Sequence, residues 1–461
     1  MTQPLPSYQL TRHPIGSLRE IWAVSWPLML GLLSASLMFL SDRLILAKTS
    51  MAAMNGATNG GVTTWAMLVF FVVIAEATEV FVGKYNGEGS FSKVGRPVWQ
   101  MLWMILLITP LYWIGARVLA PYLFYDTGNT QNESDYFIMN LNFAPCFIGS
   151  IALASFFIGT GRMRIVTYTM LMANFLNIAL DFLFVFGFDM GCKGAALGTG
   201  LSQAFQMGIY FVSFFSKSNR EKYGTTQCGF DFKELMQCLK VAVPSAIGRI
   251  NELAAHVIFF RIMIMSGPET VTCVSLVQAF FLGLGFMIDG LMKGSTAIIS
   301  NLFGANQKTL ISKVIRSSIS LHAILYVIIS VILLGWIEPI AGCFFSAEER
   351  ILLHNSAFLE TLRTATFWMT IYFLFDGCCW VFFGLFTAAN DTKFVMYVNL
   401  VMNWVSYILP VYIVVKVFGG NAAAAWMVLA FYNCTILTCY YLRYRTKIAP
   451  MTRLQPDAVP G

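Results

Sequence analysis

Residues 174–199 of this chain read NFLNIALDFLFVFGFDMGCKGAALGT. Up to Phe188 the stretch is almost entirely apolar, yet Asn177 and Asp181 lie inside it. A helix that crosses the hydrocarbon of a bilayer needs about 20 mostly apolar residues. An ionisable side chain is costly there, so it usually faces the interior of a helix bundle and serves a function. The stretch therefore predicts a membrane-spanning helix with functional polar residues.

The composition of the whole chain agrees with a membrane protein. Of the 461 residues, 57% are apolar and 11% are charged, and the mean hydropathy is +0.68. Soluble domains carry about 25% charged residues, so this chain needs lipid around much of its surface. The net charge of +7 is typical of basic cytoplasmic loops. The basic residues are scattered singly, and we expect no nucleic-acid partner.

Motifs of enzymes and ATP-driven pumps are missing from the sequence. It contains no GxxxxGK[ST], HExxH or GxSxG motif, so we expect neither an enzyme nor a bound cofactor. Its ten cysteines lie mostly in apolar runs and form no CxxC pair. This pattern predicts small buried side chains rather than disulfides.

The apolar runs predict an all-α integral membrane protein with twelve transmembrane helices. In the first half of the chain the predicted spans cover about residues 21–47, 60–82, 101–119, 136–158, 165–188 and 195–215. In the second half they cover about residues 241–265, 270–290, 319–337, 364–387, 394–417 and 421–442.

Lys and Arg residues are distributed unevenly between alternate loops. Twenty of them lie in the loops and termini on one side of the predicted membrane, and six lie on the other. Basic loops tend to remain in the cytoplasm. We therefore expect both termini in the cytoplasm and a multi-pass protein of the inner (plasma) membrane.

The longest polar loop, residues 216–237, falls after six predicted spans and divides the chain into two lobes, 1–227 and 228–461. The motif SKVGR at 92–96 recurs as SKVIR at 312–316. With six spans each, the two lobes would have the same orientation and form a parallel repeat. Transporters often bind their substrates between such repeats.

Four polar side chains in the first lobe form the strongest candidate site: Asp42, Asn177, Asp181 and Thr199. Asn177 and Asp181 are four residues apart, so they share one helix face. Two carboxylates, an amide oxygen and a hydroxyl suit a hard cation such as Na⁺, or two nearby carboxylates can retain a proton. Hydrogen bonding between helices is the alternative interpretation. Arg43 follows Asp42 directly, and it would hold this carboxylate ionised if it reached back.

Glu252 and Asp376 form a second candidate pair, near the middle of the membrane in the second lobe. Acidic side chains at this depth are candidates for binding a cation or a substrate. Arg249 and His256 lie at i−3 and i+4 relative to Glu252, so local neutralisation of this carboxylate is the alternative.

The stretch at 174–199 resembles the fifth and sixth helices of the multidrug and toxic-compound extrusion (MATE) family. Trp-Pro-Leu at 26–28, Asn-Gly at 86–87 and Gly-Ala at 304–305 also resemble that family. The resemblance implies two six-helix lobes in a V around a central cavity, and efflux driven by Na⁺ or H⁺. The family's cation site in its first lobe matches the four positions of the first candidate site. In its NorM-like branch, acids that match the second pair are implicated in cation coupling.

We expect amphipathic, cationic, drug-like compounds as substrates of a monomer in the lipid bilayer. The alternative is a flippase or exporter of lipid-linked intermediates or anionic metabolites with a related fold. Its cavity would be basic, and Arg249, Arg261 and Lys293 leave that alternative open. Pro27 leaves a backbone carbonyl unpaired and is a candidate hinge in the first helix.

Overall fold

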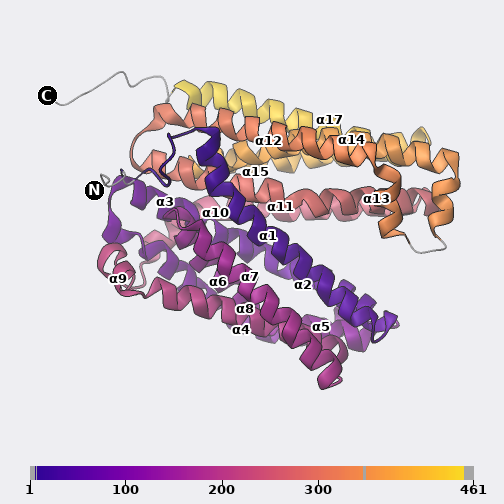
Figure 1. The fold of residues 1–461 in the computed structure, drawn as a ribbon, viewed down its shortest axis with the longest axis horizontal. Coiled ribbons are helices and arrows are strands. Elements are labelled where there is room, and N and C mark those ends of the chain that lie inside the picture. Colours follow the sequence, from indigo (N-terminus) through magenta and orange to yellow (C-terminus); the bar gives the residue numbers. More distant parts are fainter. Residues whose placement is uncertain (1–5, 7, 346–348, 451–461) are drawn as a thin grey trace. The chain divides into compact units, whose positions relative to one another are not determined.

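The computed structural model describes residue 6, residues 8–345 and residues 349–450, and all regular structure in these ranges is helical (Figure 1). A helix satisfies its own backbone N–H and C=O groups, which lipid cannot do. The first half of the chain forms α1 (Leu18–Ala47), α2 (Met51–Glu76), α3 (Thr78–Glu88), α4 (Arg96–Leu123), α5 (Thr130–Asn142), α6 (Ala144–Gly159), α7 (Met163–Asp181), α8 (Gly191–Phe214) and α9 (Lys217–Tyr223). The second half forms α10 (Phe232–Ile264), α11 (Pro268–Gly304), α12 (Ile311–Gly335), α13 (Ile337–Phe344), α14 (Ser356–Ala388), α15 (Thr392–Met402), α16 (Leu409–Tyr412) and α17 (Ala422–Arg443).

Nine helical runs in the described ranges are long and apolar enough to cross a membrane. A tenth combines α5 and α6 across a bend of 45°, beside Pro145, which lacks the N–H that would continue the helix. The predicted spans 195–215 and 241–265 coincide with α8 and α10, which are helical but outside that set. Several charged residues in α10 and several glycines in α8 lower their hydropathy. The chain is thus a multi-span helical membrane protein.

The chain divides into two compact units. The first contains mainly Val24–Ala246 with Thr296–Asn306, and the second contains mainly Ile247–Ser295 and the chain from Gln307 onward. The chain ends that we expect in the cytoplasm, residues 1–5 and 451–461, lie outside the described residues.

In the first unit, α1 packs closely against α7. The Thr167 hydroxyl donates a 2.5 Å hydrogen bond to the carbonyl oxygen of Pro27, and the Asn174 amide donates to the hydroxyl of Ser34. Gly31 leaves room for Met170, whose sulfur would lie 2.8 Å from a Cβ at that position. Small residues and interhelical hydrogen bonds of this kind hold helices together in lipid.

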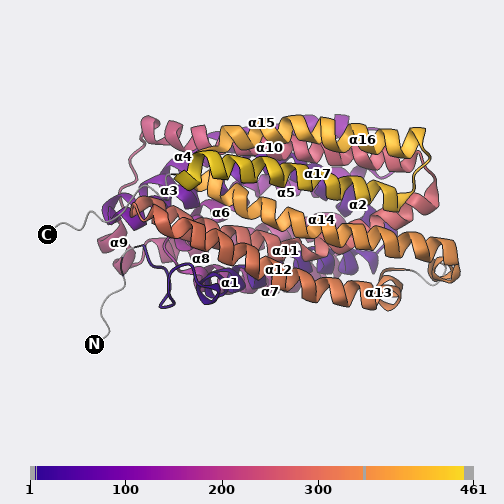
Figure 2. The same cartoon turned by 90° about the horizontal axis from the view of Figure 1, so that it is seen from above.

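In the second unit, α14 and α17 lie side by side in both views (Figures 1 and 2). The imidazole of His322, on α12, packs where Gly377 of α14 has no side chain, since a Cβ there would lie 2.2 Å from the ring. Its Nε2 lies 3.1 Å from the carbonyl oxygen of Phe373. The buried histidine is therefore engaged with the backbone of α14.

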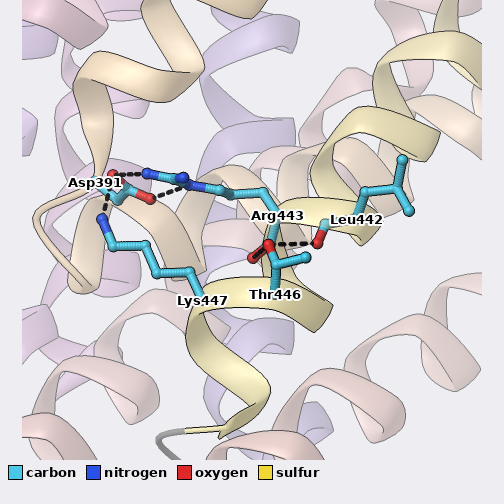
Figure 3. A network of polar contacts seen from close by, with 5 residues as sticks. All are labelled: Asp391, Leu442, Arg443, Thr446 and Lys447. Atoms are coloured by element: carbon cyan, nitrogen blue, oxygen red, sulfur yellow. Dashed lines mark hydrogen bonds and ion pairs between the residues drawn. The ribbon is translucent and has the colours of Figure 1, made fainter.

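An ion cluster fixes the loop between α14 and α15 to the end of α17 (Figure 3). The Arg443 guanidinium donates to both carboxylate oxygens of Asp391, from Nε at 2.9 Å and from Nη2 at 3.1 Å. Lys447 donates from Nζ to Oδ1 of Asp391 at 2.8 Å. Burial raises the pKa of Asp391, but its hydrogen bonds and charge attraction with these two cations outweigh burial and lower the pKa below its usual range.

The two halves of the chain repeat the same local irregularities. A π-helix, Phe182–Gly187, follows α7, and another, Asn403–Ile408, follows α15. Positive φ angles at Gly89 and Asn306 are each followed by a short 3-10 helix, and the second of these is Lys308–Leu310. π-Helical turns are rare and are frequent at functional sites.

Candidate functional site

The first four predicted site residues come together inside the first unit. α1 carries Asp42, α7 carries Asn177 and Asp181, and α8 carries Thr199. All four are buried, with at most 2% of any side chain exposed. Asp181 is the last residue of α7, immediately before the π-helix.

Hydrogen bonds connect the four side chains in a chain across three helices. The Thr199 hydroxyl donates to Oδ2 of Asp42 at 3.1 Å. The Asn177 amide donates to Oδ1 of Asp181 at 3.3 Å and to the hydroxyl of Thr199 at 3.4 Å. The carboxyl groups of Asp42 and Asp181 are also close enough to influence each other electrostatically. The cluster thus joins residues that are 157 positions apart in the sequence.

Three oxygen atoms of this cluster are buried without a hydrogen-bond donor among the described residues: Oδ1 of Asp42, Oδ2 of Asp181 and Oδ1 of Asn177. An unsatisfied polar atom in a buried site costs about 1–3 kcal/mol. Each of these atoms has lone pairs that can coordinate a cation, and either carboxylate can take up a proton. The arrangement can therefore bind one hard cation or hold a proton.

A glycine makes room for one of the carboxylates. A Cβ at Gly198, on α8, would lie 2.3 Å from Oδ1 of Asp181. Contacts below about 3 Å do not occur for real Cβ atoms, so only glycine permits Asp181 to occupy this position. Gly198 is a site residue that we did not predict. Its one signal in the sequence is its place in the Gly-rich segment before Thr199, which does not reveal what it faces.

Arg43 turns away from Asp42 and contacts α2 and α5. Its Nη2 donates to the carbonyl oxygen of Ala57 at 3.0 Å, and its Nη1 donates to the hydroxyl of Tyr136 at 3.1 Å. The guanidinium carbon also lies 5.2 Å from the centre of the Tyr136 ring. Arg43 therefore forms no ion pair with Asp42, although its charge acts on both carboxyl groups. Tyr136 is a neighbour that sequence reasoning did not identify.

The second predicted pair lies in the second unit. Asp376, on α14, is buried and accepts a 3.1 Å hydrogen bond from the amide of Asn433, on α17. Glu252, on α10, interacts electrostatically with Asp376. Asn433 was not predicted because no local sequence pattern links it to Asp376, 57 positions away.

Glu252 already has a charged partner. Arg249 donates from Nη1 to Oε2 of Glu252 at 2.9 Å, and its guanidinium stacks over Trp380 of α14 at 4.9 Å. Nδ1 of His256 lies 3.2 Å from the backbone carbonyl of Glu252, not from its carboxylate. Of the two neutralising partners considered from the sequence, only the arginine engages the carboxylate. Asp376 is thus the less compensated acid of this pair.

Pro27 is the predicted hinge residue, and its position in the helix is preserved in the structure. Pro27 lies within α1, and its carbonyl accepts the hydrogen bond from Thr167. Within the described ranges, no group of three or more His, Cys, Asp or Glu side chains could hold a metal ion. The first cluster instead combines two carboxylates with neutral oxygens, the ligand types that hard cations prefer.

Known protein families and proteins are similar to this chain over most of its length. The MatE family model matches residues 27–183 and 244–413. A probable multidrug resistance protein NorM from Thermotoga maritima is 21% identical over 407 residues, which are 84% of this chain and 83% of that protein.

Solved structures share the fold. The crystal structure of a MATE protein in complex with MaL6 has a TM-score of 0.88 at 16% identity, over 98% of this chain and 100% of the other. A MOP superfamily transporter from Pyrococcus furiosus, for which reverse polarity of the binding pocket suggests a different function, has a TM-score of 0.86 at 16% identity, over 98% and 99% of the two chains.

Proposed function

Because this chain belongs to the MatE family of membrane transporters, we propose that it exports amphipathic, cationic, drug-like compounds across the inner (plasma) membrane. In this proposal the export is driven by exchange for Na⁺ or H⁺ and proceeds by alternating access. The name of the Thermotoga maritima relative, a probable multidrug resistance protein, supports drug export.

The proposal that export is coupled to an ion rests on the buried cluster in the first unit. Oxygens of Asp42, Asn177 and Asp181 lack hydrogen-bond donors among the residues described around them. Two carboxylates at one buried site repel each other unless a cation or proton compensates them. We propose that Na⁺ or H⁺ enters here, with Thr199 as the fourth oxygen ligand.

Binding at this cluster would be transmitted through helix packing. The cluster joins α1, α7 and α8, and α1 and α7 also meet at Thr167 and the carbonyl of Pro27. A proline inside a helix removes one backbone hydrogen bond, which permits bending. We propose that cation binding changes the packing of α1 against α7 and α8, with Pro27 as the hinge, and so alters the drug-binding cavity.

The architecture that we propose is twelve spans in two six-helix lobes, residues 1–227 and 228–461, around a central cavity, with both termini in the cytoplasm. The family model matches the chain in two separate segments, one in each lobe. The repeated π-helices, Phe182–Gly187 and Asn403–Ile408, also support a parallel repeat.

In the second lobe, we propose that Asp376 takes part in binding the cation or the cationic substrate, together with Glu252. The ion pair between Glu252 and Arg249 makes Glu252 the weaker contributor. Export of an anionic or lipid-linked substrate is the second candidate. The reversed pocket polarity described for the Pyrococcus furiosus transporter supports it for this fold, whereas the compensation of Arg249 by Glu252 weighs against a basic site here.

Ethidium efflux from proteoliposomes tests the proposal. The purified protein is reconstituted into proteoliposomes, across which either an inwardly directed Na⁺ gradient or an inwardly directed H⁺ gradient is imposed. Wild type is compared with Asp181→Asn. We expect one gradient to drive efflux and Asp181→Asn to abolish this drive. Asp189→Asn is the matched control, because this exposed residue has φ of 53° and asparagine tolerates such an angle. Absence of efflux under both gradients would refute drug export, and anionic substrates would be tested next.

A further inference from the structure

Arg43 is a cation placed within one residue of the proposed coupling site. Its guanidinium is half-buried and is held by the carbonyl oxygen of Ala57 at 3.0 Å and the hydroxyl of Tyr136 at 3.1 Å. Gly61, on α2, gives it space, since a Cβ there would lie 2.8 Å from Nη2. Two neighbouring helices, α2 and α5, thus shape the position of this side chain.

The charge on Arg43 is permanent. A guanidinium is not deprotonated in proteins. Its electric field acts on the carboxyl groups of both Asp42 and Asp181. Its hydrogen bonds, however, go to other groups, so both carboxylates keep their free oxygens.

Among the described residues, the main charges that act on the carboxyl groups of Asp42 and Asp181 are those of Arg43 and of each other. Tyr136 from α5 and Cys192 from α8 are buried and neutral groups near Arg43. On α5, Glu133 accepts hydrogen bonds from Asn59 and Thr127, and Asp135 accepts one from Gln131. Lys48 follows the C-terminal end of α1, and Lys193 lies in the first turn of α8. Both side chains are exposed, so water screens their charges.

We propose that Arg43 is the residue that sets the number of coupling ions at this site to one. With Asp42 and Asp181 ionised, the cluster and Arg43 together carry one net negative charge. A single Na⁺ or H⁺ neutralises it, whereas a second cation would leave an uncompensated positive charge in a buried region, which is costly. Without Arg43 the same two carboxylates would require two cations. This inference rests on the proposed function and defines its stoichiometry.

The experiment measures the number of cations exchanged per ethidium. Proteoliposomes containing the full-length protein are given opposed gradients of the coupling ion and ethidium, with the membrane potential clamped by K⁺ and valinomycin. The gradient ratio at which net ethidium flux is zero gives the stoichiometry. We expect Arg43→Gln to exchange one more cation per ethidium than wild type, and Arg43→Lys to match wild type.

Tyr136→Phe separates the charge from the contact. It removes the hydrogen bond that holds the guanidinium but leaves the charge in place, so the stoichiometry is expected to equal that of wild type. An unchanged stoichiometry in Arg43→Gln would overturn the proposal, and so would a Lys variant that behaves like the Gln variant. If wild type shows no ion-driven flux at all, the proposed function itself fails.

If Arg43→Gln does not fold by itself, two further variants that change the net charge of the cluster test the proposal. Asp42→Asn leaves one carboxylate opposite Arg43, with no net charge, and is expected to lose ion-driven efflux. Asp42→Asn combined with Arg43→Gln restores one net negative charge, on Asp181, and is expected to recover part of the ion-driven efflux, with wild-type stoichiometry, although the carboxylate oxygens of Asp42 are lost. If Arg43 had only a structural role, the double variant would be worse than the single one, and that result would overturn the proposal.

Discussion

The side-chain amide of Asn86, at the end of α3, donates a 2.7 Å hydrogen bond to Oδ1 of Asn301, near the end of α11, across 215 positions of sequence. Both residues belong to the first unit, and both are buried. Asn301 in turn donates to the carbonyl oxygens of Gly159, at 2.9 Å, and Ala297, at 2.8 Å. One asparagine therefore connects α3, α6 and α11.

Glycines allow α3 and α11 to approach this closely, and adding one methyl group is expected to separate them. A Cβ at Gly304 would lie 2.0 Å from the carbonyl oxygen of Lys84. Overpacking of this kind typically costs about 1–3 kcal/mol. We expect Gly304→Ala to lower the thermal unfolding temperature of the purified protein in detergent. Gly283→Ala, in the same helix and with nothing within 4 Å, is expected to be neutral or slightly stabilising; equal effects of the two changes would contradict the close contact.

Gly198→Ala is expected to damage the candidate cation site without changing any of its polar residues. The new Cβ would overlap Oδ1 of Asp181 at 2.3 Å and displace the carboxylate. A displacement of about 1 Å can cost on the order of 100-fold in a positioned site, so ion-driven ethidium efflux should fall by at least about tenfold. Gly208→Ala, also in α8 and with open space around it, is the matched control. Normal efflux in Gly198→Ala would show that this position of Asp181 is not needed for coupling.

Glu252→Gln is expected to preserve ion coupling better than Asp181→Asn does. Glu252 is already compensated by Arg249 at 2.9 Å, whereas Oδ2 of Asp181 has no donor among the described groups around it. We therefore expect efflux in Glu252→Gln to fall by less than about tenfold, with the drive by the coupling ion intact. Parallel efflux assays of both variants measure this difference, and complete loss of coupling in Glu252→Gln would place the essential carboxylate in the second lobe instead.

Pro27→Ala is expected to slow transport while leaving the ion stoichiometry unchanged. Alanine restores the N–H that proline lacks, so α1 gains a backbone hydrogen bond and loses a point of bending. The side chains of Asp42 and Asp181 are untouched by this change. Transport rate and stoichiometry are measured in the same proteoliposomes, with Pro110→Ala, inside α4, as a control for proline removal. An unchanged rate would eliminate Pro27 as a hinge.

The ion cluster at Asp391 makes stability depend on pH. Burial raises its pKa, but Arg443 and Lys447 lower it by more, so the folded pKa is below that of the unfolded chain. A lowered folded pKa gives stability that is present above the unfolded value, about 3.9, and is lost as pH falls through the folded value. Asp391→Asn is therefore expected to lose about 2 kcal/mol near neutral pH and to approach wild type below about pH 4. Unfolding temperatures measured from pH 3 to 8 test this, with Asp189→Asn as the exposed control; a constant difference at all pH values would contradict it.

Much of the helical organisation was predictable because its causes are local. Hydropathy over about 20 residues indicates a span, and each predicted span overlaps a described helix. α8 and α10 show the limit of hydropathy, since glycines and charged residues make them less apolar although they are helical. The four-residue spacing of Asn177 and Asp181 fixed their common face in the same local way, and their hydrogen bond follows from it.

Contacts between distant helices depended on packing. The apolar runs placed Asp42 and Thr199 in their helices, but their 3.1 Å hydrogen bond requires α1 and α8 to meet at one depth and rotation. The direction of Arg43, toward Tyr136 rather than Asp42, was set by the space that Gly61 leaves on α2. A helix forms from hydrogen bonds within its own segment, so its sequence suffices to predict it. Which side chains share a buried site is determined by how separate helices fit together, and that free energy belongs to no single segment.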